Sequence, residues 1–232
     1  MATTTTTTTR QITTEDVENK YNLEHSSGSS GLPTIIMQPD TIANPGPLGL
    51  CGFALTTFVL SLHNAGAGVP ADGPHGVVTG LAIGYGGIAQ LLAGMWEFKT
   101  GNTFGATAFS SYGAFWISFG MMFIPSTNIL ASYSDPDVLR QSLGYYLLGW
   151  TIFTGIMLIA SHRSSAGLVS LFFFLFITFI LLTVGKLQNS LNSQIAGGAF
   201  GIVTAIIAWY NALSGLLTKD SSYFSLPIGR LR

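Results

Sequence analysis

Charged side chains are scarce in this chain, and their scarcity indicates its class. Only 8% of the 232 residues are charged, whereas a soluble domain usually carries about a quarter. Residues 41–218 hold charged side chains at five places, namely Asp72; Glu97 and Lys99; Asp135, Asp137 and Arg140; Arg163; and Lys186. The apolar stretches between these places approach the ~20 residues that a helix needs to cross a bilayer. We therefore expect a membrane protein and not a soluble fold.

Other features are lacking as well. Cys51 is the single cysteine, so an intramolecular disulfide is excluded, and without basic neighbours it should pack as a small residue. The N-terminus has no apolar signal-peptide run, so the first membrane helix should target the chain. Basic clusters, phosphate loops, metal-ligand clusters and a nucleophile with its base are also lacking. We expect no nucleic-acid partner, no enzyme activity, no cofactor and no metal.

The hydrophobic pattern predicts an all-α membrane protein. Residues 171–182 read LFFFLFITFILL, without the alternation that a strand of a membrane barrel needs. The predicted spans cover residues 47–64, 76–96, 102–124, 141–160, 166–185 and 193–217. We therefore expect six transmembrane helices per protomer, in a domain of residues 41–218.

The ends of the chain differ from this domain. Residues 1–40 combine a threonine run, scattered acids and a Ser/Gly stretch, which predicts a disordered tail whose hydroxyls could be phosphorylated or could have no fixed role. Residues 219–232 should form a short C-terminal tail. Six spans divide the basic residues into Arg10, Lys20, Lys99, Arg163, Lys219, Arg230 and Arg232 on one side and Arg140 and Lys186 on the other. The positive side faces the cytoplasm, so both termini are predicted to be cytoplasmic.

Small residues indicate how the helices pack. Gly80 with Gly84, and Gly197 with Gly201, form GxxxG pairs that allow close approach within a bundle or between subunits. A pore lined by exposed backbone is the alternative. Residues 84–86 read GYG and are similar to a potassium filter, but they lie inside a span without a pore helix, so a cation channel is not expected.

Polar side chains within the spans are almost all uncharged. With no acid or base predicted near the middle of a span, we expect no proton relay on the protein. His63 and His162 lie near helix ends, where water or backbone would satisfy them. Two polar stripes follow helical spacing, namely Phe53, Thr57, Leu60 and Asn64 on the first helix and Thr103, Thr107, Ser111, Ala114 and Ser118 on the third, with Tyr112 about 100° away. Their hydroxyls either bond to neighbouring backbone or line a path for a small polar solute.

Two dipeptides predict helix starts. In Asn44-Pro45 and Asn102-Thr103, asparagine suits the cap and proline tolerates the first turn. The first, third and fifth helices should begin on the cytoplasmic side, where their free N–H groups favour a small anion. Glu97 partly opposes this field.

Three blocks resemble a known family. Residues 44–53 read NPGPLGLCGF, residues 85–116 read YGGIAQLLAGMWEFKTGNTFGATAFSSYGAFW, and residues 226–229 read LPIG. They are similar to the acetate uptake transporter family, which includes yeast acetate and ammonia-export-linked membrane proteins and the bacterial succinate–acetate permease. The matching motif residues are Asn44, Pro45, Pro47, Gly49, Asn102 and Thr103, with Gly46 where the family most often has alanine. The tail at 1–40 lies outside the resemblance and looks like that of eukaryotic members.

The resemblance implies a homohexamer, with six transmembrane helices and one substrate path in each protomer. We expect the protein to lie in the plasma membrane. The resemblance also implies acetate and related short monocarboxylates as substrates, with succinate in some members. The hydrophobic constriction of the family falls on Phe53 and Tyr112 within the matching blocks. Its third member falls on Leu175, by alignment through Gly185.

The predicted function is therefore transport of acetate and similar acids, channel-like or linked to protons. We expect an apolar gate of Phe53, Tyr112 and Leu175, beside a hydrogen-bonding path of Thr57, Asn64, Thr107 and Ser111. Two alternatives stay open. One is a conduit for ammonia or ammonium, which Tyr85, Tyr112 and Trp116 could line through cation–π contacts. The other is a non-transporting membrane sensor of acetic acid, for which the hydroxyl-rich tail is the only indication.

Overall fold

The computed structural model describes residues 42–218 and 222–231, so the predicted tail at 1–40 lies outside the described residues. The described residues form helices and no β-strand. The elements are α2 (Gly46–Asn64), α3 (Val78–Ile83), the π-helix η1 (Gly84–Ala89), α4 (Gln90–Lys99), α5 (Thr103–Met122), the 3-10 turn η2 (Pro125–Thr127), α6 (Pro136–Ala160), α7 (Ala166–Leu187) and α8 (Leu191–Leu216). The all-helical prediction is confirmed for this part of the chain.

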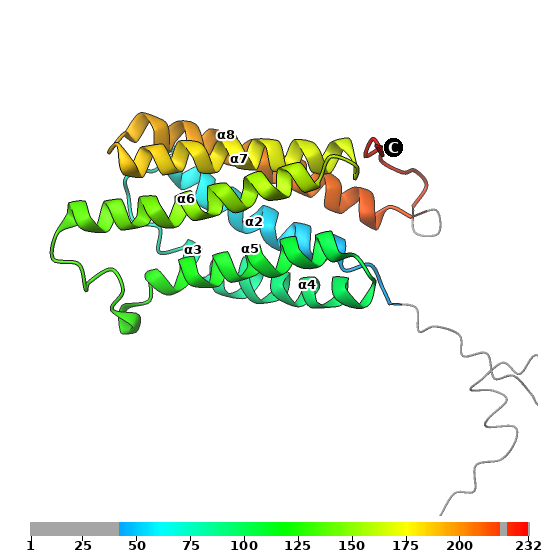
Figure 1. The fold of residues 1–232 in the computed structure, drawn as a ribbon, viewed down its shortest axis with the longest axis horizontal. Helices are drawn as coiled ribbons and strands as arrows, with labels where there is room; N and C mark the ends of the chain where they lie inside the picture. Colours follow the sequence, from blue (N-terminus) through cyan, green and yellow to red (C-terminus); the bar gives the residue numbers. More distant parts are fainter. Residues whose placement is uncertain (1–41, 219–221, 232) are drawn as a thin grey trace, which may run out of the picture. The chain divides into compact units, whose positions relative to one another are not determined.

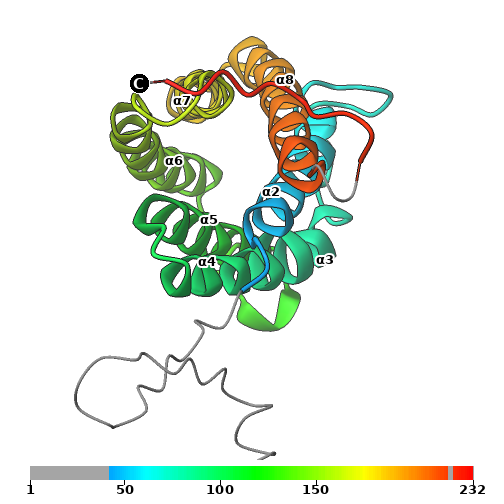
Figure 2. The same cartoon turned by 90° about the vertical axis from the view of Figure 1, so that its right-hand side faces the viewer.

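The long helices run side by side in one bundle, in which α3, η1 and α4 form a continuous rod (Figure 1). Seen from one end, the rods surround a central axis (Figure 2). Backbone contacts are extensive between α2 and α8, α8 and α7, α7 and α6, and α4 and α5, and α2 also packs on η1. Between α5 and α6 side chains meet, as where Tyr112 on α5 contacts Trp150 and Thr154 on α6. The start of α2 and the end of α8 lie at the same end of the bundle (Figure 1).

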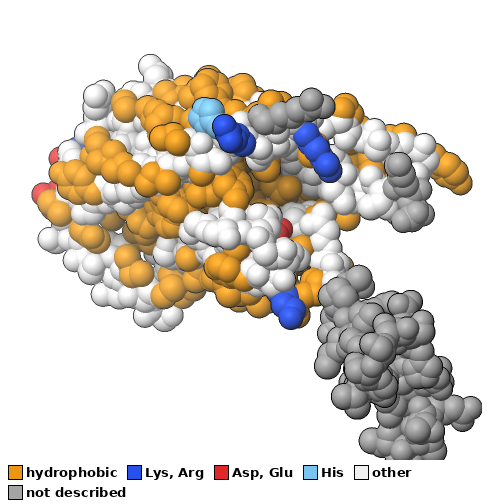
Figure 3. Space-filling model, turned by 45° about the vertical axis from the view of Figure 1, so that its right-hand side comes forward, with side chains coloured by type: hydrophobic (Ala, Val, Ile, Leu, Met, Phe, Trp, Pro, Cys, Tyr) orange, Lys and Arg blue, Asp and Glu red, His pale blue; other side chains and the backbone are white. Residues whose placement is uncertain are grey.

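The outer surface of the bundle is apolar. Ile152, Ile156 and Ile159 on α6 are 60%, 58% and 73% exposed, and hydrophobic side chains cover much of the face in Figure 3. Within the described residues, five rods are long and apolar enough to cross a membrane: α2, Val78–Lys99, α6, α7 and α8. Such a surface is typical of a protein surrounded by lipid. The chain is therefore an integral membrane protein.

The helix α5, which was also predicted as a span, is less apolar than these five rods. It has 20 residues and no charge, but threonine, serine and glycine take up much of its length. Six crossings therefore remain a prediction.

Asparagine side chains shape the starts of α2 and α5. Asn102 caps α5 as predicted, because its Oδ1 accepts the N–H of Gly105 over 3.0 Å. In α2 the N-cap residue is Pro45 and not Asn44. Asn44 precedes the cap by one residue, and its Oδ1 accepts the N–H of Gly46 over 3.0 Å. The prediction of Asn44 as the cap is wrong by one residue.

The helix α6 begins earlier than its hydrophobic pattern indicates. The sequence predicts a start at 141, after the charged residues, whereas the helix begins at Pro136. The side chain of Asp135 accepts the N–H of Asp137, and Asp137 pairs with Arg140 over 3.0 Å. A charged first turn can therefore extend a membrane helix beyond the apolar segment.

The two predicted GxxxG pairs have different surroundings. Gly197 and Gly201 lie inside the bundle, where a Cβ on Gly201 would collide with the hydroxyl of Ser61 on α2. A Cβ on Gly80 or Gly84 would meet nothing within 4 Å, and both glycines are exposed. The first pair packs helices within the protomer, and the second leaves an open face.

The C-terminal segment 222–231 folds back over the start of α7 (Figure 2). The N–H of Ala166 donates to the carbonyl of Gly229 over 2.7 Å, and the N–H of Gly167 donates to the carbonyl of Ile228 over 3.1 Å. These N–H groups have no partner within their own helix, because the first turn of any helix leaves its donors free. The LPIG block thus completes the start of α7.

Candidate functional site

Two cavities inside the bundle meet at a pair of shared side chains. We call the first, of about 200 Å³, the Lys186 cavity, and the second, of about 170 Å³, the Glu97 cavity. The Lys186 cavity extends to residues at the end of α2 and the Glu97 cavity to residues at its start. Phe53 and Leu175 line both cavities. A continuous path through the protomer would therefore pass these two residues.

The predicted gate residues come from three helices and surround this junction, which we call the neck. Phe53 on α2, Tyr112 on α5 and Leu175 on α7 are 5%, 3% and 3% exposed. The ring centroids of Phe53 and Tyr112 are 5.8 Å apart, and Tyr112 also lines the Glu97 cavity. The hydroxyl of Tyr112 lies 2.9 Å from the hydroxyl of Thr154 on α6, which positions the phenol ring.

The polar stripe on α2 faces the Lys186 cavity. All four members line it, namely Phe53, Thr57, Leu60 and Asn64. The helical spacing of these residues places them on one face, and α2 turns that face inward. Of the predicted path residues, Thr57 and Asn64 therefore lie at a cavity.

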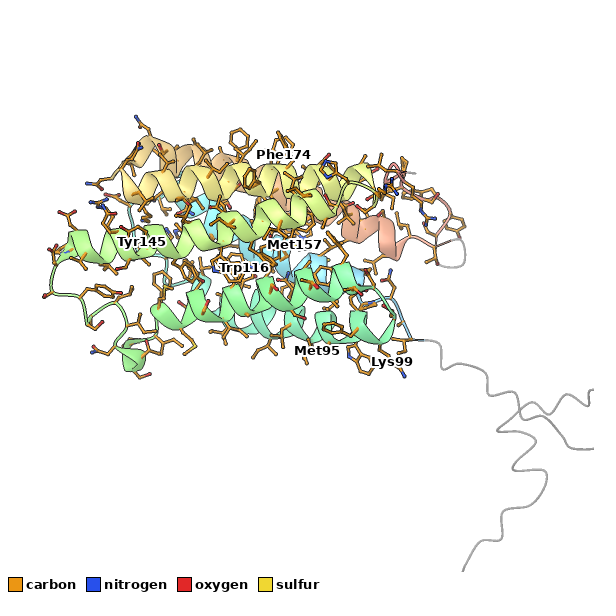
Figure 4. The ribbon with its side chains drawn as sticks, viewed as in Figure 1. Met95, Lys99, Trp116, Tyr145, Met157 and Phe174 are labelled. Carbon is orange, nitrogen blue, oxygen red and sulfur yellow. The ribbon has the colours of Figure 1, made fainter. Side chains whose placement is uncertain are left out.

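Three buried polar atoms at the cavities have no hydrogen-bond partner in the described part of the chain. They are the hydroxyl of Thr57 and the indole nitrogen of Trp116 at the Lys186 cavity, and the side-chain oxygen of Gln90 at the Glu97 cavity. Figure 4 shows Trp116 in the interior of the bundle between α5 and α6. A buried polar atom without a partner costs roughly 1–3 kcal/mol. These atoms are suited to bond a polar solute that enters the cavities.

The other two predicted path residues lie elsewhere. Thr107 is exposed, and its hydroxyl donates to the carbonyl of Thr103 over 2.8 Å. Ser111 is half-buried and lines neither cavity. The structure therefore does not bring Thr107 and Ser111 to the neck, and Thr107 bonds to its own helix.

An acid and two asparagines meet at the Glu97 cavity. Glu97 is 4% exposed, and its carboxylate accepts from Asn102 over 2.8 Å and from the hydroxyl of Thr100 over 3.3 Å. Asn44 lines the same cavity. The motif residues Asn44 and Asn102 thus support helix starts and a polar cavity at once.

The remaining motif residues have packing roles. Pro45 and Pro47 lie at the start of α2, and a Cβ on Gly49 would come 2.7 Å from the ring of Phe109. Thr103 is the exposed first residue of α5. None of these four motif residues lines either cavity.

The far end of the Lys186 cavity is polar and basic. Lys186 donates to Gln194 over 3.1 Å, and the Nε2 atom of His75 lies 3.2 Å from the Oδ1 atom of Asn64. The centroid of the His75 ring also lies 5.7 Å from that of the His63 ring, with the two ring planes tilted by 49°. Burial lowers the pKa of His75, and the positive charges of His63 and Lys186 lower this pKa further. His75 is therefore neutral near neutral pH.

The sequence interpretation missed several of these residues. Gln90 and Glu97 stand seven residues apart with only apolar residues between them, a two-turn spacing that puts both on one face. That signal was available. Lys186 and Gln194 belong to different helices separated by a turn, so no helical spacing relates them.

The chain has clear relatives. Residues 30–232 match the sequence pattern of the GPR1/FUN34/yaaH family. This chain belongs to that family. The resemblance expected from the blocks at 44–53 and 85–116 is thereby confirmed.

Curated members of the GPR1/FUN34/yaaH family are closely similar. Acetate permease A of Emericella nidulans is 48% identical over 198 residues, which cover 80% of this chain and 65% of the relative. Ammonia transport outward protein 2 of Saccharomyces cerevisiae is 47% identical over 192 residues, which cover 80% of this chain and 67% of the relative. The chain thus spans about two-thirds of the length of these relatives.

A solved structure has the same fold. The bacterial acetate channel SatP is 37% identical and superposes with a TM-score of 0.72, covering 82% of this chain and all of the channel chain. The helical bundle described above is therefore the fold of a known membrane channel.

Proposed function

We propose that this protein transports acetate and related short monocarboxylates across a membrane, through one path in each protomer. The observation that carries the proposal is the junction of the two cavities at Phe53 and Leu175, next to Tyr112. A path with cavities on both sides of a narrow apolar neck suits a small solute. The names of two relatives, acetate permease A and the acetate channel SatP, support acetate as that solute.

The neck determines the form in which the acid crosses. An isolated carboxylate is very costly to transfer into an apolar site, and the neck offers no charge to offset this cost. Neutral acetic acid can cross the neck, or the anion can cross when the neck widens and takes up water. Thr57 and Trp116 can donate hydrogen bonds to the acid on one side, and the side-chain oxygen of Gln90 can accept one on the other.

We further propose six crossings with both termini in the cytoplasm, and a homohexamer in the plasma membrane. The start of α2 and the end of α8 lie at one end of the bundle, which fits an even number of crossings (Figure 1). Lys99 lies at this end (Figure 4), as the excess of basic residues on the cytoplasmic side requires. The open face at Gly80 and Gly84 leaves room for the helix of a neighbouring copy.

Flux by the purified protein in proteoliposomes tests the transport proposal. Uptake of labelled acetate above that of protein-free vesicles is expected, with competition by propionate. A Met121→Ala variant, altered at an exposed residue of α5 that lines neither cavity, is the matched control and should transport acetate as the wild type does. If the wild-type protein is correctly folded and moves no acetate, the proposal is wrong, and a membrane sensor becomes the better interpretation.

The same vesicles distinguish an ammonium conduit. Methylammonium flux without acetate flux would favour it, in line with the name of the yeast relative, ammonia transport outward protein 2. We expect the opposite result, because the cavity on one side of the neck carries Lys186 and would repel a cation.

A further inference from the structure

Lys186 places a positive charge in the transport path without a neutralising acid. It lies in the last turn of α7 and lines the Lys186 cavity. Its ammonium donates to Gln194, and no Asp or Glu of the described residues lies within 4.0 Å of it. An ammonium has three N–H donors. Beyond the bond to Gln194, two donors are left for a further partner.

The neighbouring Arg140 and His75 do not neutralise the charge of Lys186. Arg140 donates to the carbonyl oxygens of Lys186 over 2.6 Å and of Leu187 over 3.1 Å, and its guanidinium is already paired with Asp137. His75 is neutral near neutral pH, as shown above. Asp72, Asp135 and Asp137 do not line the cavity, whereas Lys186 does, so an anion that enters the cavity meets the ammonium of Lys186 as the nearest charge.

The rest of the cavity wall suits the other half of a short fatty acid. Leu60, Phe119 and Leu182 line it between the polar end and the neck. A solute with one carboxylate and a short alkyl group could therefore bond at Lys186 and keep its alkyl group against apolar side chains.

We propose that Lys186 binds the carboxylate of a small monocarboxylic acid in the Lys186 cavity and holds it there before it enters the neck. This inference rests on the proposed transport function and adds the residue that captures the anion. Because Phe53 and Leu175 line the same cavity as Lys186, an anion at Lys186 faces the neck without crossing another barrier. Lys186 thereby raises the local concentration of substrate on this side.

A structural role for Lys186 is the alternative. Its bond to Gln194 connects α7 to α8, and the amide of Gln194 donates in turn to the carbonyl of Ala71 in the segment after α2. If this connection were its only purpose, loss of Lys186 would lower the stability of the protein without changing its apparent affinity for acetate.

The experiment compares Lys186→Gln and Lys186→Arg in proteoliposomes. Acetate uptake is measured at pH 7, where almost all acetate is ionised because carboxyl pKa values lie at about 4 to 5. For Lys186→Gln we expect the apparent KM to rise about tenfold, the effect of losing one charge-assisted hydrogen bond, with a maximal rate near that of wild type. Lys186→Arg keeps the charge and should restore the KM. Lys99→Gln, altered at the opposite end and outside both cavities, is the matched control and should behave as wild type.

Two results would overturn the proposal while leaving acetate transport in place. One is an unchanged KM in Lys186→Gln, and the other is an equal rise in Lys186→Gln and Lys186→Arg, which would indicate a structural role. Absence of acetate flux in the wild-type protein would instead refute the proposed function itself.

A measurement on the wild-type protein covers the case in which the variants do not fold. The lysines are labelled with an amine-reactive reagent, with and without sodium acetate, and the labelled sites are followed by mass spectrometry. Acetate should slow the labelling of Lys186 and leave the exposed Lys99 unaffected, with sodium chloride at the same concentration as the control. Equal labelling of Lys186 in both salts would contradict carboxylate binding.

Discussion

Replacement of Phe53 by alanine should open the neck and admit larger acids. The ring of Phe53 is 5% exposed, lines both cavities and lies 5.8 Å from the ring of Tyr112. Without it, cavities of about 200 and 170 Å³ are joined by a wider passage. Water can then enter the neck, so a polar group can cross it without losing its hydrating water.

The expected size of the effect follows from the second carboxyl group of succinic acid. Burying one polar group without a partner costs about 1–3 kcal/mol in proteins. Succinic acid carries one such group more than acetic acid, so a wetted neck should raise the ratio of succinate to acetate flux by about 5- to 150-fold. Loss of the aromatic pair with Tyr112 should cost stability as well, by about 0.5–1.5 kcal/mol beyond the lost burial of the ring.

The assay is uptake of labelled acetate and labelled succinate by proteoliposomes, with equal amounts of folded protein verified by gel filtration. Phe58→Ala is a matched control, because it removes the same kind of ring from the same helix, where the ring contacts Trp209 and lines neither cavity. Its flux ratio should stay close to that of wild type. If Phe53→Ala folds normally and its flux ratio is also unchanged, the neck does not control selectivity.

Three further predictions concern single side chains. Thr57→Val removes a buried hydroxyl that has no partner among the described residues. Stability should therefore change by less than about 1 kcal/mol while acetate flux falls several-fold, and a large loss of stability with normal flux would contradict this role. Asn102→Ala loses both the cap of α5 and the bond to the carboxylate of Glu97, which should lower the free energy of unfolding in detergent by about 1–3 kcal/mol; an unchanged unfolding midpoint would show that neither bond contributes. Burial and the positive charges of His63 and Lys186 lower the pKa of His75 from the ordinary 6.5. The unfolded chain therefore binds protons more readily, and stability should decrease as the pH falls below about 6.5. His75→Asn should remove this part of the pH dependence, and an identical profile in both proteins would count against the shift.

Most of the fold was predictable because membrane helices leave a simple pattern in the sequence. All six predicted spans correspond to helical rods, and the fifth was placed at 166–185 against an observed Ala166–Leu187. The errors in the predicted spans concern helices that contain charged or polar residues. Helix α6 begins at Pro136, because its first turn is charged but well capped. In α5 the hydroxyls and glycines lower the apolarity, although the helix is continuous.

The candidate site was predictable in part, and there is a physical reason why some of its residues could be predicted and others could not. The stripe on α2 faces the Lys186 cavity because helical spacing fixes which residues share a face, and one side of α2 points inward. The stripe on α5 follows the same rule, yet its inward face carries Tyr112 and Trp116 instead of Thr107 and Ser111. Periodicity shows which residues share a face, but it does not show which face points inward. The bond between Lys186 and Gln194 depends on the turn between α7 and α8, which no periodicity describes.

The charges on the two sides of the neck indicate how a proton travels. Charged side chains line the cavities, Lys186 on one side and Glu97 on the other, while the neck residues Phe53, Tyr112 and Leu175 are uncharged. A carboxylate held at Lys186 must leave this partner to cross, and neutralisation by a proton removes most of the cost of entering an apolar neck. We therefore expect acetate flux at a fixed gradient to follow the protonated fraction of the acid. An additional ionisation in the pH profile that disappears in a His63→Asn variant would show that the protein supplies the proton itself.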